Sequence, residues 1–372
     1  MCALIPAISM LPRVECFVFL YNFVPQLKIH TLVRTIWFIV NPISGTEDKK
    51  RIIAKIPEYF PESRFTVSIK YTEYAGHAAE IARQAVEENV YIVVAVGGDG
   101  TVNETARALV HSQVALGIVP CGSGNGLARH LYLPMNPEGA LQVISECNIH
   151  TLDYGLINGL PFFCTAGVGF DAFLSDKFNK SGKRGLMSYI ENALREGHAY
   201  EPETYELEVL DSGSEIQTYK AFLITCANAS QYGNDFYIAP HASMSDGLMD
   251  VTIMEPFGVL ESAQIAYQLV NRTITQNSRI KTLRCKDLVI RRASAGVIHV
   301  DGDPRDAEAE VRVSLVPKSI RMVVNVNKQP WQPPLLRMFN DLYTDMSTPF
   351  REAPKKIARI NEEFLSMLRN KN

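Results

Sequence analysis

The amino-acid sequence predicts an α/β domain with a mostly parallel sheet, followed by a second domain that is a mainly antiparallel β-sandwich. Two observations predict this order. Short apolar stretches alternate with helical stretches from residue 35 to about 150, which is typical of a parallel sheet covered by helices. After about residue 152, short segments alternate apolar and polar residues, as in antiparallel sandwiches and barrels. The length of 372 residues is sufficient for two cores.

The first domain is expected to contain four parallel strands and intervening helices. A helix is expected over 76–89, and the strands are expected at 36–40, 65–71, 91–96 and 115–119. Because the carboxyl ends of parallel strands meet at one edge of a sheet, and ligands bind there, the four loops that follow these strands should converge.

The second domain is expected to contain many short strands and two helical insertions. The helices are expected near Leu186–Glu196 and over Val259–Arg272, and the strands at 205–210, 219–226, 251–254, 288–292, 297–300, 311–316 and 320–326. Proline-rich residues 329–334 mark its end. Apolar positions of residues 357–368 then share one helical face with basic neighbours, which fits packing on the protein body, on a second subunit, or on a membrane.

These patterns divide the chain into four parts. Residues 1–33 are expected to be a poorly ordered extension, because prolines and charges interrupt the apolar residues and no signal peptide or membrane-spanning pattern is present. The first domain covers 34–150 and the second covers 151–328. Residues 329–372 form a tail with an amphipathic helix.

The composition is that of an ordinary globular protein. Apolar residues make up 47% of the chain and charged residues 21%. A net charge of −3 without a long basic run argues against nucleic-acid binding. The seven cysteines lack CxxC spacing, so free thiols in a reducing compartment are expected.

All four loops of the first domain have the composition of phosphate-binding turns. They are Asn41–Gly45, Thr72–His77, Gly97–Asn103 and Pro120–Gly126. Glycine lets the backbone approach a ligand closely, and N–H groups at a helix start favour phosphate. Asp99 would repel phosphate unless a divalent cation lies between them, so the sequence predicts a nucleotide site with Mg²⁺. Thr101 and Glu104 have the spacing of a helix capping box.

Other well-known sites are excluded by spacing. The chain contains no GxxxxGK[ST] motif, no GxGxxG fingerprint and no HExxH motif. The second domain contributes acids instead, because Asp301 and Asp303 lie two residues apart in a tight turn between strands. Aspartate and glycine are also what a plain hairpin turn requires, so this spacing alone leaves both interpretations open.

Taken together, these segments resemble the lipid kinase family that contains bacterial diacylglycerol kinases, sphingosine kinases and ceramide kinases. The resemblance covers roughly 35–328 and rests on Asn41–Gly45, Gly97–Glu104, Gly122–Arg129, Ala239–Leu248 and Val300–Asp303. It implies an ATP-binding domain and a β-sandwich lipid-substrate domain, with the active site between them.

The resemblance also assigns roles to individual residues. It implies that ATP contacts Asn41, Ser44, Thr72, Gly97, Gly98, Asp99, Gly100, Thr101, Val102, Asn103 and Ser123. Asp99 would hold Mg²⁺, and Asp303 would be the proton acceptor, with Asp301 as its rival. Asp171 would contact the lipid head group. A structural Mg²⁺ would be held by Ser243, Asp246 and Leu248, the first and last through their backbone carbonyls.

The resemblance implies an ATP- and Mg²⁺-dependent kinase of a membrane lipid alcohol, such as diacylglycerol, a sphingoid base or ceramide. Such an enzyme would be cytoplasmic and peripheral at the inner membrane face. The sequence leaves open whether it forms a homo-oligomer. Kinases of soluble substrates such as NAD share a Gly-Gly-Asp-Gly loop, so they are one alternative. A catalytically silent lipid- or nucleotide-binding module is another.

Overall fold

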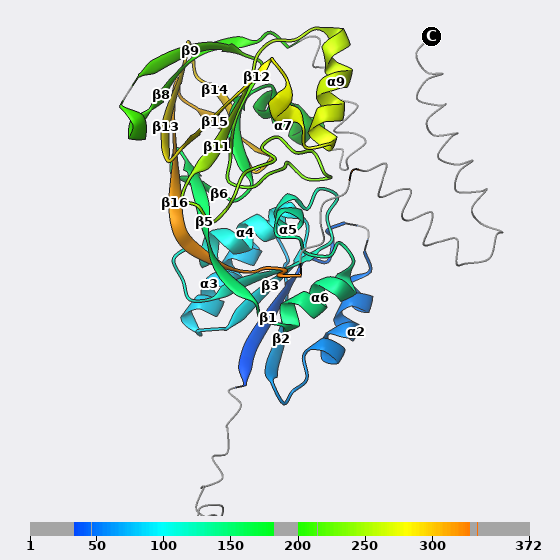
Figure 1. Ribbon diagram of the computed structural model, residues 1–372. Coiled ribbons are helices and arrows are strands. Elements are labelled where there is room, and N and C mark those ends of the chain that lie inside the picture. The colour runs from blue at the N-terminus through cyan, green and yellow to red at the C-terminus, as the bar shows by residue number, and fades with distance from the viewer. Residues whose placement is uncertain (1–32, 46, 182–199, 214, 328–332, 334–372) are drawn as a thin grey trace, which may run out of the picture.

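The computed structural model describes residues 33–45, 47–181, 200–213, 215–327 and 333, which form two lobes (Figure 1). The helices are α2 (Lys49–Tyr59), α3 (His77–Glu87), α4 (Asp99–Leu109), α5 (Gly126–His130), α6 (Pro137–Ser145), α7 (Phe170–Ser181), α9 (Val259–Val270) and the 3-10 turns η1 (Leu210–Ser212) and η2 (Ile274–Gln276). The strands are β1 (Arg34–Val40), β2 (Phe65–Tyr71), β3 (Ile92–Gly97), β4 (Ala115–Pro120), β5 (Ile149–Ile157), β6 (Leu160–Phe162), β7 (Thr165–Gly169), β8 (Glu203–Val209), β9 (Ile216–Ala221), β10 (Leu223–Ala227), β11 (Met249–Met254), β12 (Ile280–Cys285), β13 (Asp287–Arg292), β14 (Gly296–Val300), β15 (Asp303–Ala307) and β16 (Glu310–Val323).

The first lobe is built on the parallel strands β2-β1-β3-β4, in that order. Strands β3 and β4 are buried along their whole length, as expected for a sheet covered on both faces. Helices α3 and α4 pack together on one side, and α2 and α6 on the other (Figure 1). The four strands end at the same level, because Val40 pairs with both Tyr71 and Val96, and Gly97 pairs with Pro120.

The second lobe is a sandwich of two mainly antiparallel layers. One is the six-stranded sheet β12-β11-β10-β7-β14-β15, and the other contains β16, β13, β8 and β9. Alternating residues of the two layers, including Val168, Ile224, Leu207 and Val313, share one buried core. Both domains therefore have the architecture that the alternation patterns predict, and the expected fold class is confirmed.

The two lobes share one continuous sheet. The first part of β16 pairs with β13, and its end pairs in parallel with β4 of the first lobe. Strand β5 runs antiparallel to β16 along both parts (Figure 1). The sequence predicts two strands here, at 311–316 and 320–326, which is wrong. One strand is present, and its ladder is irregular between Val316 and Ile320, where Lys318 has a φ of +48°.

A second expectation fails at Phe222. The predicted strand 219–226 is two strands, because β9 pairs with β8 and β10 pairs with β7 and β11 of the other sheet. The expected helix over 259–272 is confirmed as α9 (Val259–Val270). The expected helix near 186–196, the tail helix and residues 1–32 of the expected extension lie outside the described residues.

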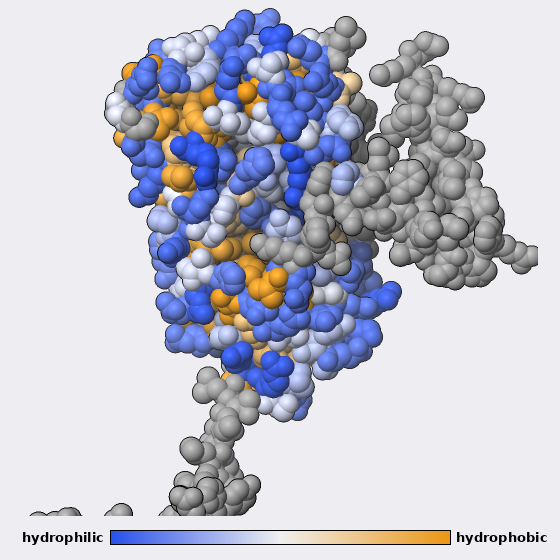
Figure 2. All heavy atoms as spheres, viewed as in Figure 1, coloured by the Kyte–Doolittle hydropathy of each residue, from blue (hydrophilic) through white to orange (hydrophobic). Residues whose placement is uncertain are grey.

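Two properties of the described residues bear on the predicted environment. Cys121, Cys147, Cys164, Cys226 and Cys285 are free thiols, as predicted for them. Within the ranges given above, no helix combines the length and apolar character that crossing a membrane requires. Figure 2 shows a mostly hydrophilic face whose apolar patches are distributed over both lobes.

Gly167 of β7 offers a test of the sandwich. A Cβ atom there would lie 2.2 Å from the backbone oxygen of Ile224 in β10, so Gly167→Ala has to separate two central strands. We expect the free energy of unfolding to fall by roughly 2 kcal/mol or more in urea denaturation. Gly100→Ala is the control, because a Cβ at that position of helix α4 meets no atom within 4 Å. Equal stabilities of the two variants would contradict the packing described.

Candidate active site

The four predicted phosphate loops lie side by side at the carboxyl edge of the parallel strands. The side-chain amide of Asn41 donates a hydrogen bond of 3.1 Å to Thr101 Oγ, which joins the first loop to the third. The N–H of Gly76 donates to Glu104 over 2.9 Å, which joins the second loop to helix α4. The structure therefore brings together residues that are 60 and 28 positions apart in the sequence.

Asp99 joins the third loop to the fourth. Its two carboxylate oxygens accept backbone N–H bonds of 2.9 Å from Asn125 and 3.0 Å from Gly126, at the start of α5. Burial raises the pKa of Asp99, whereas these two N–H groups lower it by stabilising the charged form. Asp99 is therefore a carboxylate fixed in place by the chain itself, at the loop where phosphate is expected.

The predicted capping box at the start of α4 is wrong. The helix begins at Asp99, two residues before Thr101, and Gly98 is its N-cap residue without a side-chain bond. Thr101 accepts the Asn41 amide, and Glu104 accepts the Gly76 N–H, so both side chains bind other loops. A local sequence spacing could not show that tertiary partners would take these groups.

Glycines permit the close approach of the third and fourth loops. A Cβ on Gly122 would lie 2.7 Å from the Cα of Gly98, and a Cβ on Gly124 would lie 2.9 Å from the carboxylate of Asp99. The remaining predicted ATP contacts surround this point. Ser44 donates its hydroxyl to the carbonyl of Asn41, Thr72 is buried at the end of β2, and Ser123 is exposed.

Asp301 occupies the first position of a two-residue hairpin turn between β14 and β15. Its φ is +51° and that of Gly302 is +88°, which is the backbone that an Asp-Gly turn adopts. The turn is partly exposed, but the Asp301 carboxylate points inward and accepts backbone N–H bonds of 2.7–3.0 Å from Phe163, Cys164 and Thr165. Burial raises its pKa to about 6, against the opposing effect of these three bonds. The sequence left open whether these residues form a plain hairpin turn or a candidate site. The turn is a hairpin, and it also carries the candidate acids.

Asp303 has a different environment from Asp301. Its side chain is 53% exposed, and its closest cation is Arg305, whose guanidinium lies 3.9 Å away. The carboxylate of Asp303 is therefore accessible to a ligand, whereas that of Asp301 is engaged by the backbone.

Cys164 lies between the acids of the two lobes. Its N–H donates to Asp301, and its sulfur is 3.4 Å from where a Cβ on Gly126 would be. Gly126 in turn donates its N–H to Asp99. Burial raises the pKa of the Cys164 thiol well above its usual value, and the nearby carboxylates of Asp301 and Asp99 raise it further. Asp99 and Asp301 thus lie on two sides of one contact between the lobes.

Comparison with known proteins identifies both lobes. Residues 35–157 match the diacylglycerol kinase catalytic domain, and residues 164–324 match the YegS C-terminal NAD kinase beta sandwich-like domain. The chain belongs to the diacylglycerol kinase family. The resemblance that the sequence motifs indicate is confirmed.

Relatives of this kinase family cover most of the chain. A diacylglycerol kinase of Mycobacterium tuberculosis is 29% identical over 316 residues, which are 80% of this chain and 97% of that protein. A protein of Chromohalobacter salexigens named probable lipid kinase YegS-like is 29% identical over 76% of this chain and 91% of its own length. The crystal structure of a diacylglycerol kinase from Bacillus anthracis has the same fold, with a TM-score of 0.63 and 19% identity over 80% of this chain and 99% of that one.

Asp171 lies in the β lobe of this family member, at the start of α7, and is buried. Its carboxylate accepts bonds from Thr225 Oγ at 2.6 Å and from the Tyr232 hydroxyl at 3.1 Å, and it pairs with His299 Nε2 at 3.0 Å. The assignment of Asp171 to the lipid head group stays a prediction. His299, two residues before Asp301, is buried beside this carboxylate.

The loop expected to hold a structural Mg²⁺ forms an ion pair with a neighbouring strand, β12. One carboxylate oxygen of Asp246 pairs with the guanidinium of Arg284, which also lies 3.4 Å from Asp250, its cross-strand partner. The other oxygen of Asp246 accepts the N–H of Leu248 at 3.2 Å, and the hydroxyl of Ser243 bonds to that of Ser245. These bonds do not involve the backbone carbonyls of Ser243 and Leu248, so the assignment of a structural Mg²⁺ to this loop stays a prediction.

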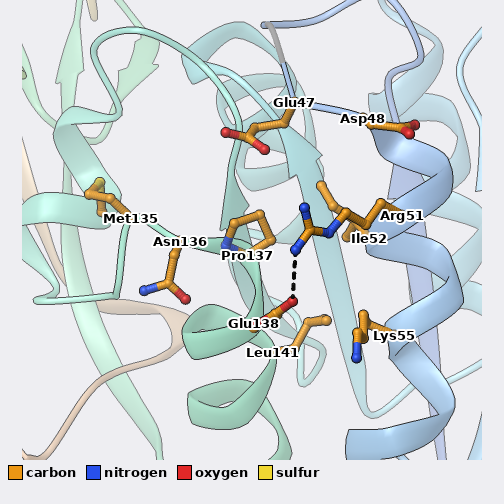
Figure 3. A pocket seen from close by; sticks show the side chains of 10 residues that line it. All are labelled: Glu47, Asp48, Arg51, Ile52, Lys55, Met135, Asn136, Pro137, Glu138 and Leu141. Atoms are coloured by element: carbon orange, nitrogen blue, oxygen red, sulfur yellow. Dashed lines mark ion pairs between the residues drawn. The ribbon is translucent and has the colours of Figure 1, made fainter. Parts of the chain in front are cut away.

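One cavity of the described residues lies away from these acids. It has a volume of about 380 Å³ and lies between α2 and α6 (Figure 3). Arg51 and Glu138 form an ion pair of 3.7 Å across it. None of the predicted site residues lines it, so we do not assign the reaction to this cavity.

The environment of Asp301 predicts a specific pH dependence of stability. Since the folded pKa of about 6 exceeds the usual 3.8, the folded protein binds this proton more tightly, and ionisation between about pH 4 and pH 6 destabilises it by at most roughly 3 kcal/mol. Asp301→Asn should remove this decrease, measured as the free energy of unfolding in urea across that pH range. Parallel curves for the variant and the wild type would show that Asp301 titrates normally.

Proposed function

We propose that this chain is an ATP- and Mg²⁺-dependent lipid kinase, which transfers the γ-phosphate to the hydroxyl of a lipid alcohol. One observation carries the proposal. The Asp301–Asp303 hairpin of the β lobe meets the Gly97–Asn103 and Pro120–Gly126 loops of the α/β lobe through the contact of Cys164 with Gly126. Phosphoryl transfer needs phosphate binders and a proton acceptor that face the same point, and this contact supports the proposal that one lobe provides the binders and the other the acceptor.

The α/β lobe provides the groups that would bind ATP. Backbone N–H groups at the start of α4, together with Asn41, Ser44, Thr72 and Ser123, surround the level ends of four parallel strands. Such an edge is where α/β sheets bind nucleotides. Family membership supports the use of ATP.

Asp99 would position Mg²⁺ that arrives with ATP. When bound, that ion would neutralise charge on the phosphate oxygens. The fit is supported by the carboxylate of Asp99, whose oxygens each accept one N–H and keep a lone pair for a metal-bound water. Among the described residues no cluster of three or more acids, histidines or cysteines could form a protein cage for a metal. Mg²⁺ is commonly held by one or two carboxylates, substrate phosphates and water, which suits this arrangement.

Asp303 is the better candidate for the proton acceptor. The lipid hydroxyl loses its proton as its oxygen bonds to the γ-phosphorus, and an accessible carboxylate can accept that proton. Asp303 is accessible, whereas Asp301 uses both carboxylate oxygens to hold residues 163–165. We therefore infer that Asp301 fixes the hairpin and that Asp303 acts on the substrate.

The names of the relatives support a lipid as the acceptor. Several are named diacylglycerol kinases and others lipid kinases, so diacylglycerol is the first candidate, and sphingoid bases and ceramide follow. A lipid acceptor would require peripheral contact with a membrane. We propose that the protein is cytoplasmic and contacts the inner face of the membrane. A second candidate is the phosphorylation of a soluble substrate such as NAD. One observation favours it, because the β lobe matches a domain described as NAD kinase beta sandwich-like.

A substrate panel tests the proposed reaction. We expect transfer of labelled phosphate from Mg²⁺-ATP to at least one micellar lipid among diacylglycerol, sphingoid base, ceramide and monoacylglycerol, and none to NAD. Transfer to NAD alone would replace the lipid-kinase proposal with the soluble-substrate alternative. ATP binding without transfer to any of them would indicate a silent module.

Substitution of the two acids tests their roles. Asp303→Asn should lower kcat about 100- to 1,000-fold because it removes the proton acceptor, whereas Asp303→Glu should retain most activity. Asp99→Asn should lower kcat by a similar factor, because an amide cannot accept both N–H bonds that Asp99 accepts.

The matched control for Asp303 is Asp306→Asn, an exposed acid of the same strand β15. Wild-type activity in Asp303→Asn, with the fold intact by circular dichroism, would remove Asp303 from its role. The same result in Asp99→Asn would remove Asp99.

A further inference from the structure

Lys49, the first residue of α2, is the one lysine or arginine that is buried among the described residues. Its side chain is 7% exposed, whereas its neighbour Lys50 is exposed. Burying an ammonium group is costly unless hydrogen bonds and an opposite charge compensate for it. The burial of the Lys49 ammonium group therefore requires a physical explanation, whereas an exposed lysine would need none.

The partners of Lys49 are backbone carbonyls of the first loop. Its Nζ donates bonds of 2.7 Å to the carbonyl of Ser44 and 3.1 Å to that of Glu47. Among the residues that the structure places, no carboxylate lies within ion-pair distance of Nζ. The ammonium thus has hydrogen-bond partners but no neutralising anion.

The charge lies where the first and fourth loops meet. A Cβ on Gly45 would lie 1.6 Å from the carbonyl oxygen of Cys121, so these loops are in contact. Lys49 is close enough to Cys121 to lower the pKa of its thiol, although burial raises that pKa overall. The polar side chains of Asn41–Gly45 and Pro120–Gly126 are uncharged, whereas Glu47 and Asp48, which precede Lys49, are acids, as is Asp99.

We propose that Lys49 is a positioning residue for the polyphosphate of the nucleotide. Through the Ser44 carbonyl it holds the Asn41–Gly45 loop in place, and its buried charge makes this edge attractive to an anion. The phosphates then supply the opposite charge that Lys49 lacks among the residues that the structure describes. The inference rests on the proposed function and adds to it the source of positive charge for ATP.

The inference is tested by comparing the binding of a nucleotide, which carries phosphates, with that of its nucleoside, which carries none. We expect Lys49→Met to weaken the binding of a non-hydrolysable ATP analogue about tenfold, because charge-assisted contacts with phosphate are strong and methionine keeps only the shape. Adenosine binding should be unchanged, because adenosine carries no phosphate. The loss should appear in the KM for ATP more than in kcat. Lys50→Met, one residue away and exposed, is the matched control and should bind both ligands as the wild type does.

Two results would overturn the inference while the proposed function stands. One is an unchanged affinity for the ATP analogue in Lys49→Met, and the other is an equal loss for the analogue and for adenosine, which would show a purely structural role. If the wild type bound neither ligand, the proposed function and this inference would both be wrong.

Discussion

The hydrogen bonds from Asn125 and Gly126 to the carboxylate of Asp99 are the interaction on which the rest of the site depends. They fix the fourth loop against the third, and they place Gly126 against Cys164 of the other lobe. The N–H of Cys164 then bonds to Asp301. A carboxylate in each lobe thus binds backbone N–H groups, and the two sets of bonds meet at a single contact. The site is therefore positioned by main-chain groups rather than by mobile side chains.

The continuous sheet limits how the lobes can move. Strands β5 and β16 pair with each other across the junction, and β16 also pairs with β13 in one lobe and β4 in the other. Asp153 of β5 supports the irregular point of β16 by accepting the N–H of Lys318 at 2.7 Å. The two lobes are therefore joined by backbone hydrogen bonds as well as by side-chain packing.

The sequence was sufficient to predict elements with strong local patterns. The four parallel strands, the converging loops and helix α9 follow from apolar periodicity and glycine turns, and the Asp-Gly hairpin follows from turn chemistry. It could not predict long-range pairing, so β16 was divided at Lys318 and Glu104 was assigned a local partner. It also could not show that Arg284 would pair with Asp246, or that Lys49 would be buried.

We propose above all that Asp303 of the β lobe accepts the proton of a substrate hydroxyl that attacks a phosphate bound by the α/β lobe. A crystal structure with Mg²⁺ and a non-hydrolysable ATP analogue tests it most directly. Our account predicts that the metal contacts Asp99 directly or through water, and that the γ-phosphate lies between the Gly97–Asn103 loop and Asp303. A nucleotide bound in the cavity between α2 and α6, or one whose γ-phosphate points away from the Asp301–Asp303 hairpin, would contradict it.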